Sequence, residues 1–261
     1  MLKFEKGTVV LSLDDGAKNA FRTFQEILLP YSIPATFNIS TSYICPDSEP
    51  NGPYITRGEL LEMSKSPYVE IAGHGHKHDN TIPDITTSRE LLREWLDMHG
   101  LIGFASPGSG MTKSYVLENT ALLHDIGYLY IRSAGTEEQP NQRILAIREK
   151  AERSGYTPFA IQKCGEFVWE YDSKFVNSVV ILHDHTLEEL KQLTDLAIEE
   201  KACVVLMFHN VRKPGEEKYD NLWSFDYDTF EAYIKYLSEK QNLGVLEVLT
   251  NKDAFLKGSS R

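Results

Sequence analysis

Short apolar runs alternate along the chain with amphipathic segments. Runs such as Val9–Leu13 and Val204–Phe208 are apolar without a two-residue alternation, which is typical of strands that are covered on both faces. This pattern predicts strands at eight places: Thr8–Leu13, Ala35–Ile39, Val69–Ala72, Leu101–Ala105, Tyr128–Ile131, Ser178–Leu182, Cys203–Phe208 and Val245–Leu249.

Helices are expected between these runs. In the segment Leu187–Glu200, for example, leucines recur at helical spacing and mark one apolar face. The predicted helices are Ala20–Leu29, Arg57–Ser64, Ser88–Met98, Ser114–Ile126, Leu187–Glu200 and Thr229–Glu239. Residue pairs with the spacing of a capping box or its Asp variant stand near three of the starts: Thr87 with Glu90, Thr186 with Glu189, and Asp228 with Glu231.

The alternation of strands and helices predicts an α/β fold with a mainly parallel sheet and right-handed crossovers, either a barrel or a doubly wound sheet. The 261 residues suffice for one large core. Because no internal repeat, low-complexity segment or long linker divides the chain, we expect a single domain over residues 1–261. Two irregular segments, Cys45–Tyr54 and Gly135–Asn141, are interpreted as surface loops near the entrance of a site.

Composition and charge narrow the range of partners. Hydrophobic residues make up 41% and charged residues 25% of the chain, the net charge is −11 and the pI is near 5.2. Such acidity disfavours nucleic acids and anionic membrane surfaces. It also makes a polyanionic substrate less expected, although a local basic patch could overrule the total. No apolar run reaches the ~18 residues that would insert into a bilayer.

Cysteine usage and the first residues bear on the compartment. Three widely spaced cysteines argue against a disulfide framework, and Cys203 is interpreted as a small core residue of its strand. The charged start of the chain has no apolar region before a cleavage site. A cytoplasmic location is therefore expected, while the oligomeric state stays open.

Metal-ligand chemistry follows two of the predicted strands. Asp14 and Asp15 follow the first strand, and His74 and His78 follow the third. A carboxylate and two imidazoles form a usual set of ligands for a catalytic divalent metal. Active sites of parallel α/β folds lie at the carboxyl ends of strands, where His209 also closes an apolar strand. We expect one site there, with His74 and His78 on one face of a helical turn.

Each of these residues also has a plainer interpretation. Asp14 and Asp15 could form a turn and a helix cap, and the histidines could be a surface cluster. His209 could be a buried core histidine, and His183 and His185 are rivals for its place. Asp79, which follows His78, could orient an imidazole or cap a helix.

Four segments resemble the motifs of the polysaccharide deacetylase family, the NodB homology group, also called carbohydrate esterase family 4. Leu11–Gly16 is similar to its Thr-Phe-Asp-Asp-Gly motif, and His74–His78 to its His-x-x-x-His motif. Phe104–Gly108 is similar to the third motif, usually Arg-x-Pro-Tyr, and Leu206–Asn210 to the last, usually Leu-x-His. The motif order covers about residues 8 to 250.

The resemblance implies a fold, a reaction and roles for single residues. It implies a distorted (β/α) barrel of about seven parallel strands and removal of an N-acetyl group from a carbohydrate. The implied metal ligands are Asp15, His74 and His78, holding zinc, with cobalt or nickel as substitutes. The resemblance also implies that Asp14 is the general base and His209 the general acid. The backbone N–H of Gly108, beside Pro107, would bind the oxyanion, and Leu206 or Met207 would form the wall of an acetyl pocket.

Two departures from the family pattern bear on these roles. Ala105 stands where the third motif has an arginine that pairs with the catalytic aspartate. Without that cation the pKa of Asp14 would drift upward, so we hypothesise that Arg132 supplies the charge from the next strand. A surface position for Arg132 is the plain alternative. The family's Asp-Trp motif has no clean match, and Trp169 or Trp223 could supply the aromatic wall.

Three functions remain in competition at this point. The first is a metal-dependent deacetylase acting on an acetylated carbohydrate. The second is a hydrolase of the same fold that acts on another non-peptide C–N bond. The third is a carbohydrate-binding member without turnover.

Overall fold

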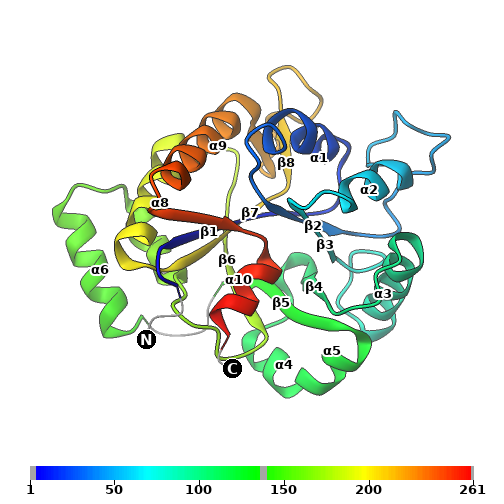
Figure 1. The fold of residues 1–261 in the computed structure, drawn as a ribbon, viewed down its shortest axis with the longest axis horizontal. Helices are drawn as coiled ribbons and strands as arrows, with labels where there is room; N and C mark the ends of the chain where they lie inside the picture. The colour runs from blue at the N-terminus through cyan, green and yellow to red at the C-terminus, as the bar shows by residue number, and fades with distance from the viewer. Residues whose placement is uncertain (1–3, 136–139, 260–261) are drawn as a thin grey trace.

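The computed structural model describes residues 4–135 and 140–259, and its centre is a closed parallel barrel (Figure 1). Its strands follow in chain order from β1 to β7, and β7 pairs back onto β1. The seven barrel strands are β1 Gly7–Leu13, β2 Ala35–Ile39, β3 Val69–Gly73, β4 Ile102–Ala105, β5 Tyr128–Ala134, β6 Phe175–Val180 and β7 Cys203–Phe208. The predicted seven-stranded (β/α) barrel is thus confirmed.

The barrel is distorted at two places. An eighth strand, β10 (Leu246–Leu249), pairs with the first half of β1, and β2 pairs with β1 only at Ser12 and Leu13. The strands β3 and β4 are joined by a single pair of residues, Gly73 and Phe104. In contrast, β1 and β7 pair without interruption from Thr8 to Leu13, so the strand that carries Asp14 is firmly fixed on that side.

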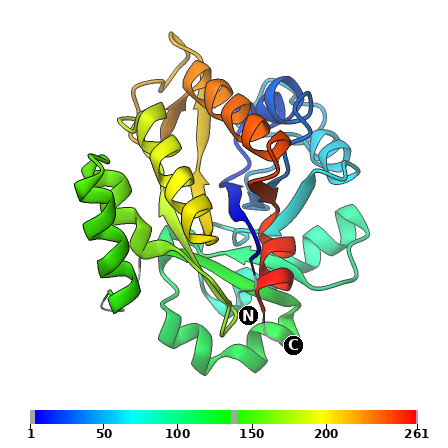
Figure 2. The ribbon, with the colours of Figure 1, turned by 60° about the vertical axis from the view of Figure 1, so that its left-hand side comes forward.

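Helices surround the barrel, and α6 stands furthest from it in Figures 1 and 2. The α-helices are α1 Lys18–Thr23, α2 Arg57–Ser64, α3 Ile82–Leu96, α4 Lys113–Glu118, α5 Thr120–Ile126, α6 Gln142–Arg153, α7 Pro158–Lys163, α8 Leu187–Glu200, α9 Tyr227–Asn242 and α10 Asn251–Gly258. A π-helical turn, Phe24–Leu28, continues α1, and 3₁₀ turns occupy Pro107–Ser109 and Cys164–Glu166. A short two-stranded sheet adds β8 Asn210–Arg212 and β9 Ser224–Asp226. Within the described residues, no helix is both long and apolar enough to span a bilayer.

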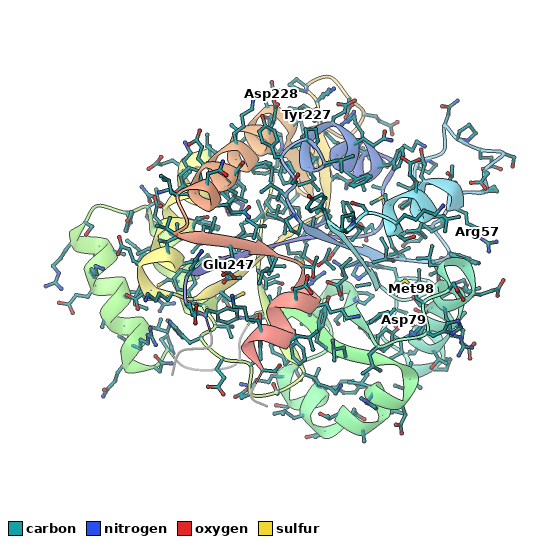
Figure 3. The ribbon with its side chains drawn as sticks, viewed as in Figure 1. Arg57, Asp79, Met98, Tyr227, Asp228 and Glu247 are labelled. Carbon is teal, nitrogen blue, oxygen red and sulfur yellow. The ribbon has the colours of Figure 1, made fainter. Side chains whose placement is uncertain are left out.

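Two of the three predicted caps are wrong. Thr186 and Glu189 form the expected capping box. Thr87 and Glu90 instead lie inside α3. This helix already begins at Ile82, because Pro83 favours a helix start there. Asp226, not Asp228, caps α9, and Figure 3 shows Tyr227 and Asp228 already at the first turn of that helix.

Alternate residues of each barrel strand face opposite layers of the core. Val9, Leu11 and Leu13 of β1 belong to the large apolar cluster that includes the surrounding helices. Val10 belongs to a smaller cluster inside the barrel, with Tyr130 and other buried residues. Cys203 lies in this inner cluster, as its expected core role requires, and all three cysteines are buried and free.

Candidate active site

Asp14 lies at the end of β1, where the barrel interior opens. Arg132 of β5 donates hydrogen bonds from one guanidinium nitrogen to both carboxylate oxygens, at 2.5 Å for Oδ2. The amide of Asn38, on β2, donates to Oδ1 at 2.8 Å. Arg132 is fully buried, so the geometry required by the Arg132 hypothesis is present, and a surface position is excluded.

The charge of Arg132 controls the ionisation of Asp14. Burial alone would raise the pKa of Asp14, but the positive charges of Arg132, His74 and His209 outweigh burial and lower this pKa to about 2. The carboxylate is therefore ionised at neutral pH and can accept a proton. This is the state that a general base needs.

Three possible ligand atoms converge beside Asp14. The Oδ1 atom of Asp15 lies 3.4 Å from Nε2 of His74 and 3.6 Å from Nε2 of His78. One ligand atom from each residue lies within 4.8 Å of the others. Three atoms at such separations can bind one ion at the usual 2.0–2.2 Å, so the predicted trio is brought together.

The hydrogen bonds of His74 test whether a metal fits. Its Nδ1 lies 2.8 Å from the carbonyl oxygen of Ala105, which fixes the proton on that nitrogen. The opposite nitrogen, Nε2, is buried and makes no hydrogen bond to the described residues. A lone pair is thus directed at the point where Asp15 and His78 meet, and the residues fit a divalent cation.

The segment that carries the histidines is not the helical turn that spacing alone suggested. His74 follows β3 directly, and His78 has a left-handed φ of 60° in an irregular loop. Asp84, at the start of α3, accepts hydrogen bonds from the backbone N–H groups of His76 and Lys77. This acceptor holds the loop in a bent path, so His74 and His78 meet without a helix.

Residues beside the ligands have other tasks. The ring of His76 points elsewhere, as expected, with Nδ1 3.0 Å from the hydroxyl of Thr41. Asp79 neither orients an imidazole nor caps α3. Its carboxylate accepts from the N–H of Asn80 at 2.6 Å, and the residue before α3 is Thr81.

His209 faces the same cavity from the end of β7. Burial lowers the pKa of His209, although Asp14 and Asp15 act in the opposite direction. A proton on this ring is therefore released more readily than from an exposed histidine. The ring of Trp223 lies over it, with centroids 4.5 Å apart.

The rival histidines lie outside this cavity. His185 accepts a hydrogen bond from the N–H of Leu182 and packs against Phe159. His183 packs against Tyr219 instead. Neither lines the cavity that holds His209.

The cavity has a volume of about 530 Å³, and two of the residues expected around an acetyl pocket line it. Gly108 and Met207 line it, and Gly108 has a φ of +55°, which glycine adopts without strain. Leu206 corrects an expectation: it alternates to the outer face of β7 and packs in the helix-covered core. Pro107 is buried behind the wall, where its carbonyl oxygen accepts from Asn80.

Two segments expected at the entrance have different outcomes. Pro53 and Tyr54, from the loop Cys45–Tyr54, line the cavity, which confirms that loop's position. Residues 136–139 of Gly135–Asn141 lie outside the described residues. Trp223 lines the active-site cavity, whereas Trp169 lines a separate one, so only Trp223 can serve as an aromatic wall there.

Asn38 and Asp84 were missed by sequence reasoning. Asn38 interrupts the apolar strand Ala35–Ile39 with a buried amide, a signal that could have been noticed. Asp84 lies in the first turn of a helix, where an acid is ordinary, so its contacts to the histidine loop had no signature.

Part of the chain matches a known protein family. Residues 2–115 match the family model described as polysaccharide deacetylase. No curated protein matches the chain. The matched part contains the Asp-Asp-Gly and His-x-x-x-His segments, but it ends before Arg132 and His209.

Solved structures match nearly the whole chain. A family 4 acetyl xylan esterase from Clostridium thermocellum, in complex with a cobalt ion, is 13% identical, with a TM-score of 0.50 over 97% of this chain and 93% of that one. A CE4 family pseudoenzyme from Bacillus anthracis is 11% identical, with a TM-score of 0.51 over 98% and 68%. A mutant of a CE4 family pseudoenzyme with restored enzymatic activity is 12% identical, with a TM-score of 0.51 over 98% of this chain and 70% of that one. At these identities the likeness shows the fold.

Three further deacetylase structures match only about half of this chain. They are a de-N-acetylase from Aggregatibacter actinomycetemcomitans, a deacetylase from Streptococcus pyogenes and a deacetylase domain from Bordetella bronchiseptica. The match spans 63%, 54% and 64% of their respective lengths.

Proposed function

We propose that the chain is a member of the polysaccharide deacetylase family, whose model matches residues 2–115, and that it is a metal-dependent amidohydrolase that removes an N-acetyl group from a carbohydrate. Water and the amide give acetate and a free amine. One observation carries this proposal: ligand atoms of Asp15, His74 and His78 converge beside an ionised Asp14. We further propose that residues 1–261 form one catalytic domain.

The donor set favours zinc, with cobalt or nickel as substitutes, because imidazole and carboxylate suit these ions. When bound, such an ion polarises the acetyl carbonyl and lowers the pKa of water. The chain's own residues then have two proton tasks. Asp14 takes a proton from the attacking water, and His209 gives one to the departing amine.

The surrounding residues position the amide. The backbone N–H of Gly108 is proposed to bind the developing oxyanion, and Met207 to close the acetyl pocket. Arg132 and Asn38 hold Asp14 in one orientation. A fixed base and a fixed donor need no rearrangement as charge develops, which is where preorganised sites gain most.

The test is acetate release from N-acetylated sugars, with metal content measured on the same sample. The variant His78→Ala should lose metal and activity together. The matched control is His76→Ala, two residues away in the same loop, whose ring contacts Thr41 instead, and it should keep both.

The outcome also separates the competing functions. Metal binding without acetate release from any sugar would favour a binding member. Ammonia or another amine released from a substrate that is not an acetamide would favour the second hydrolase. Full activity in His78→Ala would remove the proposed metal site.

A further inference from the structure

Two positively charged side chains, Arg212 and Lys218, line the active-site cavity and have no role in the proposed deacetylation. The residues that line it include the acids Asp14 and Asp15 and the basic residues Arg212 and Lys218. The chain as a whole has a net charge of −11. A cationic wall in so acidic a protein is a local exception that composition does not predict.

Neither side chain forms a recorded ion pair with a carboxylate of the described residues, although the charge of Arg212 contributes to lowering the pKa of Glu216. The two carboxylate oxygens of Glu216 accept hydrogen bonds from Arg22. The hydrogen bond of Arg212 that the structure records runs from Nη1 to the carbonyl oxygen of Glu217, at 2.8 Å. Its Nε is buried and has no partner in the described parts of the chain.

Lys218 is exposed, and its backbone is held in place. Its φ of 61° lies in the left-handed region. The hydroxyl of Ser224 and the N–H of Asn221 both donate to its carbonyl oxygen, at 2.8 Å and 3.0 Å. The loop therefore holds the backbone of this residue in place at the wall of the cavity.

The position of the cations tells which part of a substrate they face. Both belong to the segment that directly follows His209, the proposed proton donor to the amine. The acetyl group faces Met207 and Gly108 in the proposed function, so the sugar must lie toward His209. Trp223, 43% exposed and part of the same wall, offers a flat apolar surface for a sugar ring.

We propose that the substrate is an N-acetylated sugar that bears an anionic group, a carboxylate or a phosphate, bound by Arg212 and Lys218. This inference rests on the proposed deacetylase function and adds the substrate class. A guanidinium and an ammonium are the side chains that recognise such oxyanions. Their charges also attract an anionic sugar that the rest of the acidic surface would repel.

The experiment compares three sugars: N-acetylglucosamine, which is neutral, N-acetylmuramic acid, which adds a carboxylate, and N-acetylglucosamine 1-phosphate. Both kcat/KM for acetate release and Kd by calorimetry are measured. We expect one anionic sugar to be favoured about tenfold, because its anionic group gains charge-assisted hydrogen bonds that the neutral sugar lacks. The favoured arm identifies the anion as carboxylate or phosphate.

Variants test the two residues. Arg212→Gln combined with Lys218→Gln should abolish the preference. Lys218→Gln alone, at an exposed position that folding does not depend on, should reduce it about two- to fivefold. The control Arg153→Gln with Lys235→Gln removes the same charge from α6 and α9, outside the cavity, and should keep the preference.

The results separate this inference from the proposed function. Equal kcat/KM and equal Kd for the three sugars, or a preference that survives in the Arg212 and Lys218 double variant, overturns the anionic substrate while acetate release still supports a deacetylase. If no sugar releases acetate, the deacetylase proposal fails, and calorimetry still decides whether the cavity selects an anion. Rising ionic strength should shrink a true preference because salt screens it.

Discussion

Two carboxyl groups lie buried in the same barrel, and their surroundings shift their pKa values in opposite directions. Asp14, at the open end, has Arg132 against it, and the charges of Arg132, His74 and His209 together outweigh burial and lower its pKa to about 2. Glu70, on β3 near α10, accepts hydrogen bonds from Thr36, Tyr130 and the N–H of Lys252. Burial nevertheless raises the pKa of Glu70 to about 6.

The comparison shows that neutral donors do not replace a cation. Glu70 has three hydrogen-bond donors, yet desolvation still dominates. Asp14 has one buried guanidinium and one amide, and its pKa falls although it is buried. The cation therefore prepares one end of the barrel for proton transfer, while the hydrogen bonds of Glu70 tie β2, β3 and β5 to the start of α10.

The largest expected effect comes from replacing the carboxylate of Asp14 by an amide. Asp14→Asn should reduce kcat by about 10²–10⁴-fold, the usual contribution of a general base. It should also lower the free energy of unfolding by about 3–5 kcal/mol, because Arg132 is left as an unpaired buried charge. Acetate-release kinetics and urea denaturation measure the two effects.

Glu70→Gln is the control for that exchange, because Glu70 lies outside the active-site cavity. It should keep kcat near the wild-type value. Comparable loss of kcat in both variants would contradict the assignment of separate roles to the two carboxyl groups.

Removal of the cation should make Asp14 behave like Glu70. Arg132→Met leaves the carboxyl buried without a counter-charge, so its pKa should rise and the free energy of unfolding should fall by about 3–5 kcal/mol. Wild-type Asp14 contributes about 2 kcal/mol of stability above pH 4, which is lost as pH falls toward 2. The variant should lack that loss in acid denaturation.

Arg89→Met provides the matched control for Arg132→Met. Arg89 is also a buried arginine, but its guanidinium donates to the carbonyl oxygens of Met98 and Gly100, away from the site. Its loss should destabilise the fold and leave kcat unchanged. A normal kcat in Arg132→Met would show that Asp14 does not depend on the cation.

Glu70 should leave a pH signature in stability with the opposite sign. Its pKa is raised from 4.5 to about 6 in the fold, so the native state binds more protons than the unfolded chain between these values. Stability from this group is full below pH 4.5 and falls by about 2 kcal/mol as pH rises through 6. The difference between wild type and Glu70→Gln in urea denaturation, measured from pH 4 to 8, isolates this contribution, and a flat difference would contradict it.

The smallest expected effect concerns Asn38 and Thr36, two polar residues of β2. Asn38→Leu removes a donor to Asp14 and should lower kcat about tenfold, equivalent to about 1.4 kcal/mol in the transition state. Thr36→Val, two positions earlier on the same face, removes the hydroxyl that donates to Glu70. That variant should lower stability and leave kcat unchanged. Equal kcat in the two variants would show that Asn38 does not position the base.

Much of the candidate site could be predicted from the positions at which the strands end in the sequence. Asp14, His74 and His209 each follow an apolar run, and the carboxyl ends of parallel strands meet at one opening. The contact between Arg132 and Asp14 needed only the strand after the third motif to offer a cation at the same opening. What periodicity could not provide was the path of the histidine loop, because the acceptor that bends it, Asp84, lies in a separate helix.

The contact between Asn38 and Asp14 was beyond the sequence for a different reason. The pairing of Asn38 with Asp14 depends on the register between β1 and β2, which joins only Ser12 and Leu13 to β2. Helix α6, in contrast, was missed although its signal was present. Asn141 caps it, and Ile144, Ile147 and Ala151 form its buried face.

The pairing of β1 with β7 has a consequence for synthesis on the ribosome. Residues 8–13 find their partners only after residues 203–208 have been made, and elongation at about 5–20 residues per second puts roughly 10–40 seconds between the two. Throughout that interval one edge of an apolar strand lacks its native neighbour. A nascent chain of this protein therefore presents a site for chaperones, or for aggregation, until its last third emerges.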